Sequence, residues 1–250
     1  MSKQKKVVTE DNMPYRLCLA GGWMDQPFIN TYEPGSLVTI QIEPRGDFIN
    51  RAGLATSTRS TWKKLLNFNP KIEDQSELAK LLFGYENLPG KKYISGSQDA
   101  IGLTHPGINK LYYDGSFWPK KIETCLNEDI CEWLENSLYL IKIGPRPDGY
   151  DPLLQQNISR EAVQKLSMVG DMCYDAILRM DIKSFGRSLT LAHDFTRELL
   201  PLTTNTKIDN ILNSFNSNSF GRTTTSCGGG YAIIASKKEI KNGFRIKIRR

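Results

Sequence analysis

Two stretches of the chain combine glycines with side chains that could bind phosphate or a polar substrate. The first is "RLCLAGGWMDQPF", where Gly21 and Gly22 allow a sharp turn after a strand and present Asp25 beside a proline. The second is "TTTSCGGGYAII", where Gly228 and Gly229 precede a strand and allow close backbone approach to a ligand. Each pattern alone is also typical of plain turn geometry.

The stretch "RAGLATSTRSTWKKLL" places small and hydroxyl-bearing residues directly before a helical pattern. The first backbone N–H groups of a helix are free and lie at the positive end of its dipole, so they bind phosphates readily. A hydroxyl from Ser57 or Thr58 would remain for a metal ion. The alternative is an ordinary N-terminal capping box, which favours the same residue types.

A single carboxylate, Asp99, stands among glycines and a proline in "SGSQDAIGLTHPGIN". The glycines predict a loop, in which an aspartate can cap a turn. The same carboxylate could instead accept a proton from a substrate hydroxyl. The residues alone leave both roles open.

Together and in this order, these stretches resemble the GHMP family of small-molecule kinases, named for galactose, homoserine, mevalonate and phosphomevalonate. "LAGGWMDQPF" followed by "SGSQDAIGLTHPGIN" is most similar to the branch of L-fucose kinases and D-glycero-D-manno-heptose phosphate kinases. The resemblance runs from Arg16 to about Ser236, and Gln98-Asp99 followed by Pro106-Gly107-Ile108 is its most specific part.

The resemblance implies an α+β fold of two subdomains: a ribosomal-protein-S5-like N-terminal domain with the phosphate loop, residues 1–150, and a ferredoxin-like C-terminal domain, residues 151–250. It implies ATP-dependent phosphorylation of a sugar or sugar-phosphate hydroxyl, with ATP and Mg²⁺ as cofactors. The active site would lie between the two domains.

The same resemblance assigns roles to individual residues. Asp99 and Arg16 would be catalytic, and Asp25, Gln26 and Trp23 would bind the substrate. The nucleotide would be bound by Gly53, Ala55, Thr56, Ser57, Thr58, Arg59, Gly228 and Gly229. The metal would be held by Ser57, Thr58 and Glu86.

Two of the motifs depart from the family pattern. Ala55 stands where the phosphate loop usually has its second glycine, and Arg59 replaces a small residue, although its guanidinium could act as an anion ligand. Thr225, Ser226 and Cys227 stand where Gly-Ala-Gly is usual. The main rival hypothesis is therefore a diverged, non-catalytic member that binds a ligand or has a regulatory role.

Composition sets the remaining limits. The net charge of +6 favours an anionic partner without saying which. A nucleic-acid binder using the basic ends should interleave aromatics with Lys and Arg, and in "NGFRIKIRR" only Phe244 does so. The alternation of this stretch instead predicts a half-exposed strand.

The expected partner is a small-molecule sugar or sugar phosphate, with no nucleic acid and no membrane. The chain has no signal-peptide pattern, so we expect it to be cytoplasmic, and its five widely spaced cysteines predict free thiols. We expect a monomer or a homodimer.

The elements that must position these residues follow from hydrophobic periodicity. "RLCLAGGW", "SLVTIQIEP" and "YAIIAS" predict strands, and "STWKKLLNF" and "SELAKLLFGYEN" predict helices. From Ser159, a possible N-cap, apolar residues three or four apart predict an amphipathic helix that pairs with a second one over "KSFGRSLTLAHDFTRELL". The Pro- and Gly-rich "GPRPDGYDP" at 144–152 is the candidate boundary between the two halves.

Overall fold

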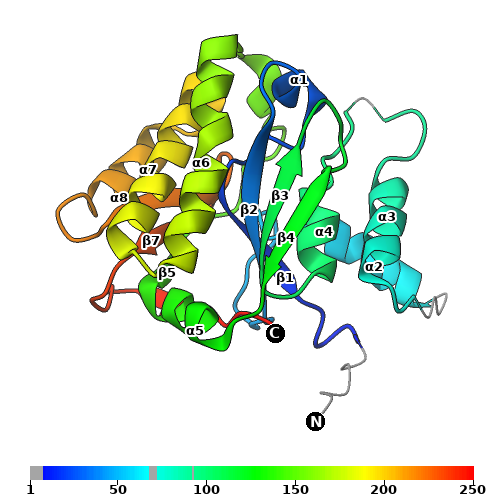
Figure 1. Ribbon diagram of the computed structural model, residues 1–250, viewed down its shortest axis with the longest axis horizontal. Helices are drawn as coiled ribbons and strands as arrows, with labels where there is room; N and C mark the ends of the chain where they lie inside the picture. Colours follow the sequence, from blue (N-terminus) through cyan, green and yellow to red (C-terminus); the bar gives the residue numbers. More distant parts are fainter. Residues whose placement is uncertain (1–7, 68–71, 92) are drawn as a thin grey trace.

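A computed structural model describes residues 8–67, 72–91 and 93–250. The first half builds an antiparallel sheet from β1 (Tyr15–Ala20), β2 (Gly35–Ile42), β3 (Ile108–Tyr113) and β4 (Lys121–Cys125), in the order β1-β2-β3-β4 (Figure 1). Every residue of β2 is buried, so this strand must be covered on both faces. Its two faces are covered by separate groups of helices.

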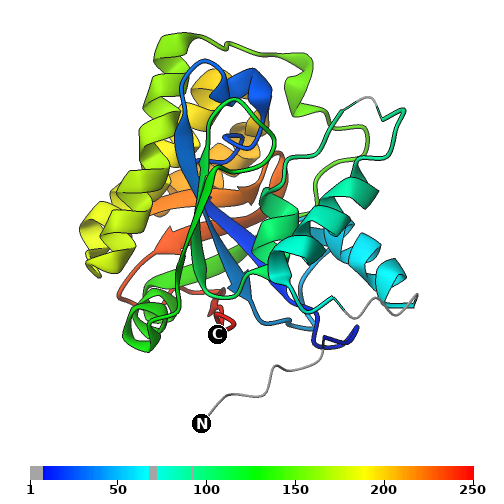
Figure 2. The ribbon, with the colours of Figure 1, turned by 45° about the vertical axis from the view of Figure 1, so that its right-hand side comes forward.

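One face of this sheet packs against α2 (Thr56–Asn67), α3 (Gln75–Glu86) and α4 (Gln98–Thr104) (Figure 2). Side chains from all three helices join Leu37 of β2 and Leu111 of β3 in one apolar cluster. The short α1 (Pro27–Asn30) precedes β2. The helices predicted over "STWKKLLNF" and "SELAKLLFGYEN" are confirmed.

The opposite face carries the long antiparallel pair α6 (Arg160–Leu178) and α7 (Ile182–Leu199) (Figure 1). The predicted N-cap is confirmed, because the Ser159 hydroxyl accepts a hydrogen bond from the Ala162 N–H. The two backbones of α6 and β2 approach closely where Gly170 meets Ser36, since a Cβ on Gly170 would lie 2.0 Å from the Ser36 carbonyl oxygen. The predicted helical pair is therefore present, and α6 is the member that packs against the central strand.

A second antiparallel sheet has the order β6-β7-β5-β8, from β5 (Leu138–Gly144), β6 (Gly221–Ser226), β7 (Gly229–Ala235) and β8 (Gly243–Arg245). It is joined by α5 (Glu128–Ser137), α8 (Thr206–Asn213) and two short 3-10 helices, η1 (Pro152–Leu154) and η2 (Pro201–Thr203). β5 precedes the 144–152 stretch yet pairs with strands that follow it. The division at residue 150 stays a prediction.

The C-terminal stretch returns to the first sheet. Ile246 and Ile248 are buried while Arg245 and Lys247 are exposed, and Ile248 forms an isolated bridge with Ile42 of β2. The extended, half-exposed conformation predicted from its alternation is confirmed. The other basic cluster, within residues 3–6, lies outside the described residues.

The loop predicted around Asp99 is wrong, because Gln98 and Asp99 open helix α4. No proline interrupts residues 98–104, and the internal Gly102 is used for close packing rather than for a turn. Asp99 therefore projects from a rigid element in the first turn of a helix. Across the described residues, no helix is both long and apolar enough to cross a membrane.

Candidate active site

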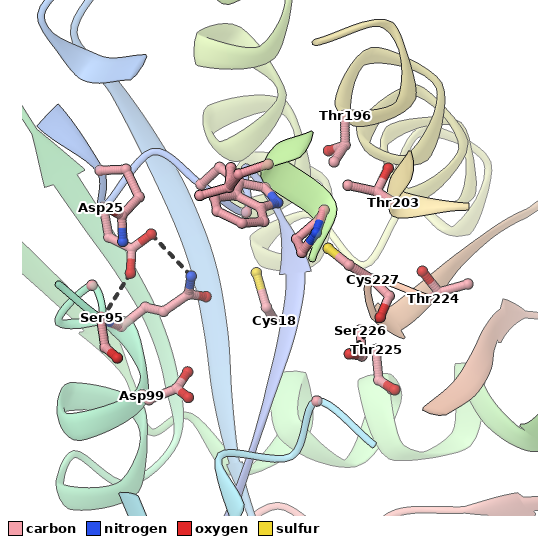
Figure 3. A pocket seen from close by; sticks show the side chains of 18 of the residues that line it. Cys18, Asp25, Ser95, Asp99, Thr196, Thr203, Thr224, Thr225, Ser226 and Cys227 are labelled. Atoms are coloured by element: carbon pink, nitrogen blue, oxygen red, sulfur yellow. Dashed lines mark hydrogen bonds between the residues drawn. The ribbon is translucent and has the colours of Figure 1, made fainter. Parts of the chain in front are cut away.

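A cavity of about 800 Å³ opens where the N-terminal ends of α4 and of η1 face the ends of β1 and β6. Figure 3 shows Asp25 and Asp99 on one side of it and Thr224, Ser226 and Cys227 on the other. The cavity therefore gathers side chains from both sheets. We call the side with Asp25 and Asp99 the acceptor side, and the side with Gly53 and Thr223–Cys227 the phosphate side, after the roles that the family resemblance implies for these segments.

Arg16 and Asp99 form an ion pair at the base of the acceptor side. Arg16 comes from β1, whose alternation turns this residue toward α4, and its side chain crosses the helix at Gly102. A Cβ at Gly102 would lie 2.2 Å from Cγ of Arg16, so glycine is required there. The Asp99 side chain is 29% exposed and that of Arg16 only 7%, which leaves the carboxylate open to a substrate.

Asp25 is buried and is held by α4. Its carboxylate accepts hydrogen bonds from the Gln98 side-chain Nε2 at 3.0 Å and from the Gln98 backbone N–H at 3.4 Å (Figure 3). Gly96 gives it room, because a Cβ there would lie 1.7 Å from Oδ2 of Asp25. Burial raises the pKa of Asp25, with the hydrogen bonds from Gln98 opposing the shift.

The other two residues expected to bind substrate also line the cavity. Trp23 has a positive φ of 79°, so the chain turns back sharply between β1 and α1 and exposes the indole to the cavity. The Gln26 side chain donates to the Ile94 carbonyl at 3.3 Å, which joins the β1–α1 connection to the segment before α4. All three predicted substrate residues thus line the cavity.

On the phosphate side, Gly53 lines the cavity and the rest of the predicted phosphate loop lies behind it. Gly53 has a φ of +71°, and a Cβ on it would lie 2.1 Å from the Thr225 carbonyl oxygen. Ala55 has a φ of +58°, the left-handed conformation that favours glycine. Thr56 and Ser57 open α2, so the expected helix start is present, although neither residue lines the cavity.

Of the three residues expected to hold the metal, Thr58 and Glu86 are in direct contact, whereas Ser57 is exposed and does not line the cavity. The Thr58 hydroxyl donates to the Glu86 carboxylate at 2.5 Å, and both side chains are buried. A Mg²⁺ ion bound with phosphates takes one or two protein oxygens and fills its octahedron with phosphate oxygens and water. Thr58 and Glu86 supply two such oxygens, although neither side chain lines the cavity. Within 8–67, 72–91 and 93–250, no cluster of three or more His, Cys, Asp or Glu forms a self-contained metal site.

Arg59, expected among the nucleotide ligands, is turned away from the cavity. Its guanidinium donates to the carbonyls of Pro14 at 2.8 Å and Met13 at 3.1 Å, and it stacks over the Tyr15 ring at 3.5 Å. The arginine thus fastens α2 to the start of β1. This structural contact explains why a large side chain stands at position 59, where the family pattern has a small one.

The glycine stretch before β7 is covered. The Gly228 N–H donates to the Thr203 carbonyl at 2.8 Å, and a Cβ at Gly228 would meet the Tyr150 ring at 2.6 Å. Gly229 begins β7. The residues of this segment that line the cavity are instead Thr223–Cys227.

Several cavity residues carried no recognisable signal in the sequence. Arg146 and Tyr150 come from the Pro- and Gly-rich connection, which composition marks only as a boundary. His193 and Thr196 come from α7, where their spacing follows the apolar stripe of the helix. Burial lowers the pKa of His193, which favours the neutral imidazole. Cys18 and Cys227 also line the cavity, and all five cysteines are free, as predicted.

Comparison with known proteins shows the fold. No protein-family model and no curated protein matches the sequence. A mevalonate kinase structure matches with a TM-score of 0.67 at 17% identity, covering 96% of this chain and 98% of the other. Lactococcus lactis galactokinase in complex with galactose matches with a TM-score of 0.62 at 15% identity, over 90% of this chain and 84% of the other.

A D-glycero-D-manno-heptose 1-phosphate kinase from Bacteroides thetaiotaomicron also matches, with a TM-score of 0.53 at 14% identity over 94% of both chains. These neighbours are GHMP kinases, and the match extends over nearly the whole chain. The α+β fold expected from the resemblance is confirmed.

Proposed function

We propose that this chain, which has the fold of the GHMP kinases, transfers the γ-phosphoryl group of ATP to a hydroxyl of a sugar or sugar phosphate. The observation that carries the proposal is the pairing of two differently placed carboxylates, Asp25 and Asp99, on one wall of the cavity. Across from them lie Gly53 and the hydroxyl-rich end of β6. Phosphoryl transfer needs mainly such positioning and charge compensation.

Asp99 has the accessible carboxylate, so it takes the role of base. It accepts the proton of the acceptor hydroxyl as that oxygen bonds to the γ-phosphorus and the bond to the departing ADP oxygen breaks. Arg16, already paired with Asp99, keeps a positive charge beside the reacting atoms. Because the pair is buried at its arginine end, solvent screens this charge little.

Asp25 and Gln98 position the acceptor. The Asp25 carboxylate is buried against Gln98 and lines the cavity, where it can accept hydrogen bonds from sugar hydroxyls. The α4 backbone holds Gln98 and Asp99 next to each other, so one helix positions both the base and the residue that orients Asp25. Thr58 and Glu86 would hold Mg²⁺, which when bound neutralises charge on the phosphates.

A comparison of the wild type with Asp99→Asn tests the base. Asparagine keeps the shape of the side chain but cannot accept the proton, so kcat should fall about 10²- to 10⁴-fold. The KM for ATP should change little. Initial rates of ADP formation with a panel of sugars and sugar phosphates provide the measurement. Full activity of Asp99→Asn on a substrate that the wild type phosphorylates would show that Asp99 is not the base.

A non-catalytic, ligand-binding GHMP-fold protein is the second candidate function. Three features of the segments predicted to bind the nucleotide favour it: a left-handed Ala55, a Gly228 N–H already bonded to Thr203, and an Arg59 engaged elsewhere. Such a protein would still be stabilised by its ligand, by about 2.7 kcal/mol at one hundred times the dissociation constant. Ligand-dependent melting without any turnover across the panel would establish this function over catalysis.

A further inference from the structure

Two arginines line the cavity, and their surroundings differ. Arg16 is neutralised by Asp99. Arg146, which follows β5, forms no ion pair with a carboxylate of any described residue. It therefore brings an uncompensated positive charge to the phosphate side.

The Arg146 guanidinium is held in place by neutral groups. Its Nε donates to the Cys227 carbonyl at 3.0 Å, and its Nη2 donates to the Ser226 hydroxyl. The Tyr150 ring lies 5.5 Å from the guanidinium carbon, and the Tyr150 hydroxyl donates to the Leu202 carbonyl. The side chain is thus pre-organised, so little conformational entropy remains to be lost on binding an anion.

Arg146 lies where the stretch that contains Gly53 meets the stretch that contains Ser226. Its backbone N–H donates to the Arg51 carbonyl at 3.1 Å, two residues before Gly53. Its side chain contacts Ser226, and a Cβ on Gly53 would lie 2.4 Å from the Ser226 Cβ. α2 begins three residues after Gly53, so the positive end of its dipole adds to the charge at this point.

We propose that Arg146 is the arginine that binds a ligand phosphate group in this cavity. The inference rests on the proposed function for its ligand class and goes beyond it in naming a residue outside the phosphate loop. A guanidinium binds phosphate oxygens with two parallel hydrogen bonds, and such charged bonds are stronger than bonds to neutral carbonyls and hydroxyls. Arg146 supplies the cation that Arg59, fastened to Met13 and Pro14, does not.

The phosphate could belong to the nucleotide or to a phosphorylated sugar, and binding measurements distinguish these sources. Calorimetry on the wild type, Arg146→Gln and Arg146→Lys would use four probes: ATP, inorganic tripolyphosphate, adenosine and galactose 1-phosphate. Loss of the charged hydrogen bonds should weaken the affected phosphate ligand about 10- to 100-fold in Arg146→Gln. Lysine keeps the positive charge but cannot form the two parallel hydrogen bonds of a guanidinium. The affinity of Arg146→Lys should therefore lie between those of the wild type and Arg146→Gln.

The pattern of losses identifies the source. Weaker ATP and tripolyphosphate binding with unchanged galactose 1-phosphate binding assigns Arg146 to the nucleotide, and the reverse assigns it to the acceptor. Adenosine binding should not change. Arg45→Gln is the matched control, since it removes one exposed positive charge that is paired with Asp47. Melting curves of every variant show that the fold is retained.

Unchanged affinity of Arg146→Gln for every phosphate probe would overturn the inference, as would a wild type that binds none of them. These outcomes differ from a failure of the proposed function. If phosphate binding depends on Arg146 but no sugar is phosphorylated, the inference stands and the kinase proposal falls. If sugars are phosphorylated and Arg146→Gln binds ATP and galactose 1-phosphate normally, the inference falls and the kinase proposal stands.

Discussion

The acceptor side and the phosphate side of the cavity are built in different ways. On the acceptor side, two glycines of α4 and its approach make room for two charged side chains, Asp25 at Gly96 and Arg16 at Gly102. On the phosphate side, glycines make room for protein backbone, as where Gly53 packs on the Thr225 carbonyl. Glycine thus makes room for charged side chains on the acceptor side and for close packing of backbone against β6 on the phosphate side.

Because of this difference, we expect the two sides of the cavity to tolerate different substitutions. A methyl group added on the acceptor side would displace a charged side chain from the reacting centre. On the phosphate side, the methyl of Ala55 is already present, and the backbone accommodates it in a left-handed conformation. We therefore expect small changes on the acceptor side to reduce turnover strongly, and changes at Ala55 to act mainly on stability and nucleotide affinity.

The largest effect among these tests is expected from Gly102→Ala. The new Cβ would lie 2.2 Å from Cγ of Arg16, so Arg16 must move and its pairing with Asp99 is disturbed. Misplacement of a catalytic group by about 1 Å can reduce the rate about 10²-fold. Steady-state kinetics measure the effect. Gly84→Ala in α3 is the control, because no atom lies within 4 Å of its new Cβ. Equal rates for both variants would mean that the position of Arg16 is unimportant.

Asp25→Asn should weaken sugar binding without lowering stability at neutral pH. A hydrogen bond to a charged group contributes about 1.5–3 kcal/mol, so the KM for the sugar should rise at least about 10-fold. The pKa of Asp25 is raised by burial, so the folded state holds this proton more tightly than the unfolded chain does.

The corresponding stability is therefore fully present below the unfolded pKa and is lost as the pH rises through the higher, folded pKa. Asp25→Asn removes this dependence. Denaturant unfolding between acid and neutral pH measures it in both proteins. A wild type whose stability rises relative to Asp25→Asn across this range would show that the buried carboxylate is favoured, contrary to the account.

The smallest effect is expected from Ala55→Gly. Glycine adopts the left-handed conformation without steric cost, so the variant should be more stable by about 1 kcal/mol, or about 2–4 °C in melting temperature. Asn242→Gly is the matched control, since Asn242 is exposed and has a φ of +62°. Only Ala55→Gly should also bind ATP more tightly. A loss of stability in Ala55→Gly would mean that the methyl contributes packing that outweighs its strain.

Sequence patterns located the long helices well, and several residues that they singled out line one cavity. Hydrophobic periodicity placed α6 and α7 because the apolar stripe of α6 faces the first sheet, that of α7 faces mainly the second, and the two helices pack on each other. Ser159 marked the start of α6 through its capping bond. Arg16, Trp23, Asp25, Gln26 and Asp99 all line the same cavity. Their motifs are short, local and tied to strand ends or helix starts, which is why they could be recognised.

Other features depended on contacts between distant segments. The helix at Asp99 was missed because its glycines suggest a loop, whereas they serve to fit Asp25 and Arg16. The position of the Arg59 side chain depends on packing against Tyr15, and that of Arg146 on contact with β6, some 80 residues away. No local pattern encodes such pairings.

Direct detection of the product tests the central claim, which is that this cavity transfers a phosphoryl group to a sugar hydroxyl. The wild type would be incubated with ATP, Mg²⁺ and each sugar or sugar phosphate of the panel, and the products would be quantified by mass spectrometry. The account predicts, for at least one acceptor, a phosphorylated product formed in equal amount to ADP and greatly reduced in Asp99→Asn. ADP without phosphorylated acceptor, or no turnover with any acceptor by protein that binds ATP, would contradict it.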